Sequence, residues 1–141
     1  MLARRDYSRA ELARRLATRG VAPEDVSPLL DDLERLGYLS DARYADAVVA
    51  RNAPEFSRRG IAESLRARGV DRDTASAALD ARTIDDHAAL VALWRRRFGR
   101  RPVDEREKAR QVRFLQSRGF ALSAILALLR APPDADDDQG P

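Results

Sequence analysis

The sequence predicts an all-α protein, an elongated tandem array of three-helix repeats in which the third repeat is truncated. One observation is a segment that occurs three times, as LATRGV (16–21), LRARGV (65–70) and LQSRGF (115–120). Its spacing of about 50 residues is typical of helical repeat proteins. The other observation is that 44% of the residues are hydrophobic but only 6% are aromatic, which suits thin helix interfaces better than one large core.

Each helix of the first repeat has its own start and stop signal. Ser8 and Glu11 have the spacing of a capping box, so a first helix should begin beside Ser8. Gly20 supplies the left-handed residue that ends this helix. Pro23 suits the first turn of a second helix, which should stop at Gly37.

A third helix should follow, capped at residues 40–41, and the same plan then recurs in the second repeat. Gly69 ends the first helix of that repeat, and Asp71 caps the second. We expect the third helix to run from about Asp85 to the break at Pro102.

The third repeat has signals for two helices only. Gly119 separates them, and a proline pair at 132–133 breaks the chain after the second. Acidic and small polar residues dominate the chain after these prolines, and such a composition predicts a disordered tail rather than a further helix. The expected divisions are therefore 1–53, 54–101, 102–131 and, for the disordered acidic tail, 132–141.

Residue content argues against several functional classes. The chain has no cysteine, so it has neither disulfides nor thiolate metal sites. It has no run of 18 apolar residues and no apolar leader, so we expect a cytoplasmic protein without a membrane span. His87 is the only histidine, and beside Asp85 and Asp86 it suits a solvent-facing or capping role better than catalysis or metal binding. We expect no enzymatic activity, no cofactor and no metal.

Positive charge is concentrated before residue 131. The whole chain has a net charge of +3, and the aspartates of the tail offset a larger positive charge on the rest. Arginines gather at three places, residues 14–19, 58–59 and 95–101. They are either solvated arginines paired with acids such as Glu11 or a periodic basic track for an acidic partner. The run at 95–101 favours an acidic partner, because like charges at one helix end repel one another.

Residues 37–51 (GYLSDARYADAVVAR) resemble the signature of the RecX family, bacterial regulators of the recombinase RecA. That signature is Gly, two apolar residues, a polar residue, Asp, any residue, Arg, an aromatic residue and Ala, and residues 37–45 match it. Three more segments agree in order and spacing, at 7–21, 60–71 and 107–120. The likeness covers residues 4–130. One departure is Ser57 where the family often has glycine, while Gly60 lies inside a helix and costs about 1 kcal/mol against alanine.

The resemblance implies a non-enzymatic, all-helical regulator that lies in the groove of the RecA filament on single-stranded DNA. There it would limit ATP turnover and strand exchange in homologous recombination, DNA repair and the SOS response. We expect a monomer that contacts DNA weakly and does not bind membranes. The side chains expected to contact the filament or DNA are Arg43, Arg51, Arg58, Arg59, Arg95, Arg96 and Arg97. For Arg43, an ion pair with Asp41 within the repeat is the alternative.

Two other functions compete with this one. The first is direct DNA binding of the helix-turn-helix kind, because short three-helix units with basic helices have that organisation. No helix, however, presents a dense set of base-reading Asn, Gln and Arg, and acidic residues intersperse the basic ones. The second is a hydrolase or metalloenzyme, which would have to work through His87 or through carboxylates alone.

Overall fold

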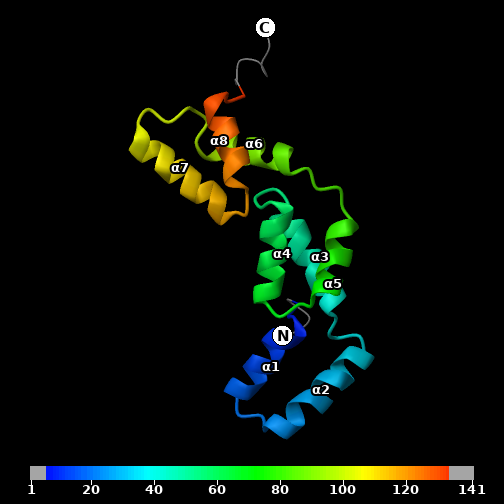
Figure 1. Cartoon of the computed structure of the whole chain (residues 1–141). Coiled ribbons are helices and arrows are strands. Elements are labelled where there is room, and N and C mark those ends of the chain that lie inside the picture. Colours follow the sequence, from blue (N-terminus) through cyan, green and yellow to red (C-terminus); the bar gives the residue numbers. More distant parts are fainter. Residues whose placement is uncertain (1–5, 134–141) are drawn as a thin grey trace. The chain divides into compact units, whose positions relative to one another are not determined.

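The computed structural model describes residues 6–133, and every regular element in this range is an α-helix (Figure 1). In chain order, the helices are α1 (Arg9–Thr18), α2 (Pro23–Arg35), α3 (Asp41–Asn52), α4 (Arg58–Ala67), α5 (Arg72–Asp80), α6 (Asp86–Arg97), α7 (Glu105–Ser117) and α8 (Leu122–Arg130). The all-α class predicted from the sequence is confirmed over the described range.

Contacts between residues divide the chain into two units. The first unit comprises the residues up to Arg51 together with residues 62–83, so it holds α1, α2, α5 and most of α3 and α4. The second unit comprises residues 52–61 and the residues from Ile84 onward, so it holds α6, α7 and α8.

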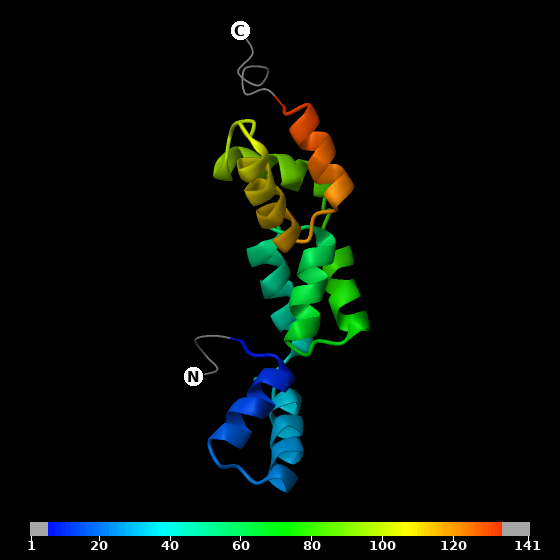
Figure 2. The ribbon, with the colours of Figure 1, turned by 60° about the vertical axis from the view of Figure 1, so that its left-hand side comes forward.

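The first unit contains a helical hairpin of α1 and α2, which lie side by side in both ribbon views (Figure 1 and Figure 2). On the side of α1 that faces α2, Leu12 is buried and Leu16 packs partly buried beside it. The buried residues of this core are Tyr7, Leu12, Leu30 and Leu39. Helices this short are only marginally stable alone in water. The hairpin is therefore stabilised mainly by the burial of these apolar side chains.

The second unit has its own core between α6, α7 and α8. Helix α8 packs against both of the other helices, and Figure 1 shows α7 and α8 joined as a second hairpin next to α6. The buried residues of this core are Leu90, Leu93, Trp94, Leu115, Phe120, Ile125, Leu128 and Leu129. Six of these eight are leucine or isoleucine, the side chains that fill a helical interface with well-defined rotamers.

The predicted helix caps are confirmed at three helices. At α1 the capping box is complete, because Ser8 Oγ accepts from the Glu11 amide at 3.0 Å and the Ser8 amide donates to Glu11 Oε1 at 3.2 Å. Ser40 caps α3 and Asp71 caps α5, each by accepting from the amide three residues later. Asp85 does the same for α6 and Asp104 for α7, although neither was predicted as a cap. Each such cap satisfies a backbone donor that the first turn of a helix leaves free.

Helix α6 ends earlier than expected. It was predicted to reach Pro102, and this was wrong, because its last helical residue is Arg97 and Gly99 turns the chain with φ of 73°. Arg101 lies beyond the helix, and its Nη2 donates to the Arg130 carbonyl at 3.1 Å. The run of arginines therefore does not sit on one helix end.

A repeated contact, which we call the helix joint, links the start of one helix to the glycine end of another. In the second unit, Ser57 before α4 donates from Oγ to the Gly119 carbonyl at 2.7 Å, and its amide donates to the Arg118 carbonyl at 3.0 Å. Gly60 packs directly on Gly119, and a Cβ at Gly60 would collide with the Arg118 carbonyl. The sequence predicts only that Gly60 lowers the stability of its helix. The structure shows that the backbone of residues 118–119 comes so close that glycine is required at this position.

The first unit contains the same kind of joint. Ser8 before α1 donates from Oγ to the Arg68 carbonyl at 2.6 Å, at the end of α4. Gly69 packs against Ala10, and a Cβ at Gly69 would collide with the Ala10 side chain. Both joint serines, Ser8 and Ser57, are buried, at 0% and 2% exposure. Each hydroxyl also accepts from an amide three residues later, so it caps its own helix and binds another helix at once.

Two sequence expectations concern the chain ends and the membrane. The predicted acidic tail at 132–141 falls outside the described residues from 134 onward, so its disorder stays a prediction. No helix found within residues 6–133 has the length and apolar character needed to cross a membrane. The proline pair at 132–133 directly follows α8 and Ala131, as expected of residues that break a helix.

Candidate basic interface

Four side chains of the second unit form an arginine–aromatic cluster, made of Phe56, Arg97, Phe114 and Arg118. The guanidinium carbon of Arg97 lies 4.3 Å from the centre of the Phe114 ring, and that of Arg118 lies 4.8 Å from the same ring. Arg118 also lies over Phe56, 4.9 Å from the centre of that ring. Phe114 thus contacts two cations. The face of an aromatic ring carries partial negative charge, so it attracts both guanidinium groups.

The local sequence explains how the members of the cluster meet. Phe114 is on α7 and Arg118 follows four residues later, a spacing that places both on one face of the helix. Arg97 is the last residue of α6, and the neighbouring Phe98 meets Phe114 edge-on with ring centres 5.7 Å apart. The aromatic pair therefore fixes the end of α6 against α7 and holds Arg97 over the ring.

One carboxylate, that of Glu55, faces two arginines at this place. Glu55 Oε1 lies 3.0 Å from Nη1 of Arg118, and Oε2 lies 3.8 Å from Nη2 of Arg96. The Arg118 side chain is 24% exposed, while those of Glu55 and Arg96 are about half-exposed. Ion pairs as accessible as these contribute roughly 0–1 kcal/mol, so an anionic group of a partner can replace Glu55 at small cost.

The arrangement is suited to binding an anion. A guanidinium group binds phosphate or carboxylate through parallel N–H donors, and stacking on a ring holds that fork in one orientation. Within the described residues, no three His, Cys, Asp or Glu side chains gather as a metal site would require. His87 lies exposed near the start of α6. The geometry of the cluster thus suits the recognition of negative charge.

Five of the seven predicted contact residues lie in the second unit. Arg96 and Arg97 belong to the arrangement around Glu55 and Phe114, and Arg95 is exposed at the same helix end. The other two, at residues 58 and 59, open α4, where Arg59 is exposed and its neighbour is half-buried. Their roles in binding a partner stay predictions.

The remaining two predicted residues, Arg43 and Arg51, lie on α3 in the first unit. Arg43 Nε lies 3.2 Å from Asp6 Oδ1, so the alternative pairing with Asp41 is wrong. Asp41 instead accepts from the Arg9 amide at 2.7 Å. Arg51 is exposed at the last turn of α3. Arg43 is therefore already paired, and a partner would have to compete with Asp6 for it.

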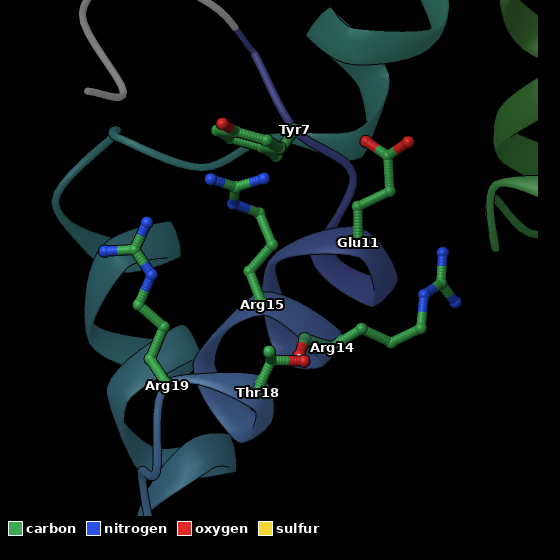
Figure 3. A pocket seen from close by; sticks show the side chains of 6 residues that line it. All are labelled: Tyr7, Glu11, Arg14, Arg15, Thr18 and Arg19. Atoms are coloured by element: carbon green, nitrogen blue, oxygen red, sulfur yellow. The ribbon is translucent and has the colours of Figure 1, made fainter.

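A surface pocket of about 450 Å³ lies beside α1 in the first unit (Figure 3). Arg15 reaches toward the face of the Tyr7 ring, with its guanidinium carbon 5.1 Å from the ring centre. Arg19 extends on the same side of the helix, while Arg14 points the other way (Figure 3). The residues that line the pocket are Tyr7, Glu11, Arg14, Arg15, Thr18 and Arg19. Three arginines against one carboxylate make it a second candidate for binding an anion.

Glu11 is held at the edge of this pocket by Tyr44 of α3. The Tyr44 hydroxyl donates to Glu11 Oε2 at 3.1 Å. Burial, and next the charge of Glu11, raise the pKa of Tyr44 above its usual value of 10.0. The hydroxyl therefore stays a protonated donor at neutral pH, and Glu11, which also accepts from the Ser8 amide, is bound by two donors.

Sequence reasoning missed Glu55, Phe114 and Arg118. A signal for Arg118 was present, because an arginine precedes each of the three repeated glycines, as Arg19, Arg68 and Arg118. Phe114 could have been found from its position four residues before that arginine. Nothing in the sequence near Glu55 points to helix α7, because this contact is made between residues 63 apart in the chain.

Three sequence models of one protein family match the chain in tandem. They describe the first three-helix domain of RecX (residues 1–33), the second (residues 40–79) and the third (residues 84–129). The second match spans α3 to α5, and the third spans α6 to α8. Each thus starts with the helix that the sequence pattern placed last in the preceding repeat, and the division at 53, 101 and 131 stays a prediction.

Similar proteins agree with these matches. A protein of Leptothrix cholodnii named Regulatory protein RecX is 46% identical over 129 residues, which cover 92% of this chain and 82% of that protein. One of the same name from Chromobacterium violaceum is 41% identical over 138 residues, covering 98% and 88%. The crystal structure of RecX from Lactobacillus salivarius matches with a TM-score of 0.65 at 20% identity, covering 92% of this chain and 89% of the other. This likeness confirms the fold of tandem three-helix domains.

Proposed function

The chain belongs to the RecX family of regulatory proteins, and we propose that it regulates the recombinase RecA by binding the filament that RecA forms on single-stranded DNA. It lies in the helical groove of that filament and limits ATPase activity and strand exchange in recombination and DNA repair. It acts as a cytoplasmic monomer and performs no catalysis of its own.

The arginine–aromatic cluster is the observation that supports this proposal most. Arg97 and Arg118 are oriented by Phe114, so little side-chain freedom is lost when an anionic group binds them. Glu55 neutralises Arg118 in the free protein through an accessible ion pair. A filament of protein and nucleic acid presents both carboxylates and phosphates, and either group can take the place of Glu55.

Contacts from both units add to one another when the partner is a polymer. Arg43 and Arg51 belong to the first unit, whereas residues 58–59 and 95–97 belong to the second. Once one unit is bound, the chain between them keeps the other near its own site at high effective concentration. Weak contacts to neighbouring RecA protomers then hold them in one geometry, which opposes the rearrangements of ATP turnover and strand exchange.

The test is RecA ATPase activity on single-stranded DNA, titrated with the protein and with a variant in which Arg95, Arg96 and Arg97 are changed to Glu. We expect the wild type to inhibit and the triple variant to need at least about tenfold more protein for half-inhibition, since three charges at one contact are reversed. Unchanged inhibition by the variant would remove these residues from the interface.

A matched control separates this site from net charge. Arg66, Arg72 and Arg82 are exposed arginines of the first unit, and their change to Glu alters the net charge by the same amount. We expect this control to inhibit nearly as well as the wild type at physiological salt, where screening weakens long-range charge effects. Equal loss in both triple variants would mean that overall charge, and not the cluster, drives binding.

Direct DNA binding is the second candidate, and the exposed arginines of α4 and α6 favour it. Binding that depends on phosphate contacts weakens steeply as salt rises. A fluorescent single-stranded oligonucleotide without RecA, titrated at low and at physiological salt, separates the two functions. Tight binding that persists at physiological salt would favour the DNA-binding function, whereas weak, salt-sensitive binding supports RecA as the principal partner.

A further inference from the structure

The two helix joints use the same residue types on each side. The entering segment reads acid, aromatic, serine, arginine, as DYSR at 6–9 before α1 and EFSR at 55–58 before α4. The receiving end is an arginine and a left-handed glycine, at 68–69 after α4 and at 118–119 after α7. The serine hydroxyl donates to a carbonyl of the receiving end in both joints.

In the joint of the second unit, the arginine of the receiving end contacts both the acid and the aromatic residue, whereas in the first joint Asp6 pairs with Arg43 and Tyr7 lies against Arg15. Arg118 forms the 3.0 Å ion pair with the acid, Glu55, and lies over the ring of the aromatic residue, Phe56. Ser57 bonds to the carbonyls of Arg118 and Gly119. Each of three successive residues of the entering segment therefore makes its own contact with the receiving end.

A third receiving end is present and open. Helix α1 ends in Arg19 and Gly20, and Gly20 has φ of 91°, between the 84° of Gly69 and the 93° of Gly119. Apart from Gly20 and its two chain neighbours, no described residue has an atom within 4 Å of the place where a Cβ of Gly20 would be, whereas the other two glycines are covered there. Arg19 is exposed, and Figure 3 shows its side chain extending on the same side of the helix as Arg15. The end of α1 thus has the backbone conformation of a receiving end. Within the described residues, no entering segment is bound to it.

We propose that the end of α1 is a docking site for the start of a helix of another protein, one with the order acid, aromatic, serine. Arg19 pairs with the acid and stacks on the ring, as Arg118 does, and the serine bonds to the carbonyls at the end of α1. The pocket beside Arg19 adds Arg15, on the same side of the helix, and has room for the aromatic side chain within its volume of about 450 Å³. This inference holds whether or not the partner is a RecA filament.

The described part of the chain, residues 6–133, does not provide the occupant. Its two entering segments, at 6–9 and 55–58, are already bound in the joints of the two units. The start of α7 offers no third segment, because residues 103–106 read VDER, without an aromatic residue or a serine. A second copy would have to break one of its own joints to enter, and this favours a different protein as the occupant.

The test uses a synthetic peptide of residues 53–67 as the probe and the whole protein as the receptor. The protein is isotopically labelled, and its amide chemical shifts are followed by NMR as the unlabelled peptide is added. We expect the Gly20 amide to shift and saturate while the Gly69 and Gly119 amides stay unchanged, because their joints are filled by the chain itself at high effective concentration.

Variants on each side make the test specific. We expect Arg19→Glu in the protein to lower the association constant by about tenfold or more, since it replaces an attraction by a repulsion. Arg35→Glu, an exposed change at the end of α2, serves as the control and should leave binding intact. A peptide carrying Glu55→Arg and Ser57→Val should bind at least about tenfold more weakly than the native peptide.

Several outcomes would overturn the proposal. They are the absence of a shift at Gly20, equal binding by Arg19→Glu, equal binding of the altered peptide, or a shift at Gly119 instead. A dimer in sedimentation that Arg19→Glu abolishes would identify a second copy as the occupant. A larger and tighter response of Gly20 to an oligothymidine would identify nucleic acid. RecA takes no part in these measurements, so their failure leaves the proposed function untouched.

Discussion

The indole Nε1 of Trp94 donates a 3.0 Å hydrogen bond to Oε1 of Gln111, inside the core of the second unit. Both residues are buried, at 2% and 5% exposure. The amide nitrogen of Gln111 in turn donates to the Arg100 carbonyl at 3.3 Å. One polar side chain therefore satisfies the only side-chain donor of the tryptophan and holds the segment after α6 against α7.

Replacing Gln111 with Leu should lower the free energy of unfolding by about 1–3 kcal/mol, because the Trp94 N–H is left buried without an acceptor. Urea denaturation followed by tryptophan fluorescence measures this loss. The control is Gln116→Leu on the exposed side of α7, which should change stability by less than about 0.5 kcal/mol. Equal effects in the two variants would mean that the hydrogen bond contributes nothing specific.

Replacing Gly60 with Ala should destabilise the protein by about 1–3 kcal/mol, because a Cβ there collides with backbone at the end of α7. Intrinsic helix propensity predicts the opposite sign, a gain of about 1 kcal/mol. Thermal and urea unfolding of the single variant decide between these two effects. A stabilised Gly60→Ala protein would contradict the close contact of the joint.

Gly20 and Gly119 allow the packing of a joint to be separated from backbone strain. Both have positive φ, at 91° and 93°, so alanine should cost about 1–2 kcal/mol at either position. Only Gly119 is also covered, by Gly60 and Ser57. We therefore expect Gly119→Ala to cost at least about 1 kcal/mol more than Gly20→Ala in urea unfolding. Equal losses would indicate that the joint adapts without strain.

Stability should decline in alkaline solution partly through Tyr44. Its pKa is raised in the folded protein, chiefly by burial, so the fold favours the protonated hydroxyl. The stability that this contributes is complete below the unfolded pKa of 10.0 and is lost as the pH rises through the folded pKa. Tyr44→Phe should make the alkaline decline shallower, as measured by urea unfolding from about pH 8 to about pH 11. Tyr38→Phe, at a residue 60% exposed, is the control and should leave the decline as it is.

Removing the charge of Glu55 should strengthen binding to an anionic partner. Glu55→Gln releases Arg96 and Arg118 from their ion pairs while it preserves the size of the side chain. We expect half-inhibition of RecA at a protein concentration roughly two- to fivefold lower, in keeping with the strength of exposed ion pairs. The control Glu105→Gln changes the net charge equally at the start of α7. If both variants gain equally, the gain comes from net charge alone.

Local signals in the sequence were sufficient for most helix boundaries. The capping box of Ser8 and the caps at Ser40 and Asp71 depend on contacts within a few residues, so they can be predicted from spacing alone. The same is true of the left-handed glycines, such as Gly20. Helix α6 was predicted too long because Gly99 was overlooked in favour of the stronger signal of a proline.

Tertiary contacts explain what the sequence did not reveal. Gly60 was interpreted as a weakness of its helix, since the backbone that approaches it comes from residues 118–119. Arg96 and Arg97 were predicted from their charge, but Glu55 and Phe114, which orient arginines at this place, lie far from them in the chain. Sequence spacing reports neighbours on one helix, and the candidate interface is assembled from several.

The helix joint has a consequence for how such a chain changes length. The same few atoms, a serine hydroxyl, a glycine and a carbonyl, fasten α1 to α4 and α4 to α7. A duplicated repeat therefore carries an entering segment before its first helix and a receiving end after that helix. Gene duplication or loss of a whole block therefore inserts or removes one repeat without redesign of its neighbours, and the number of repeats becomes a heritable, stepwise quantity.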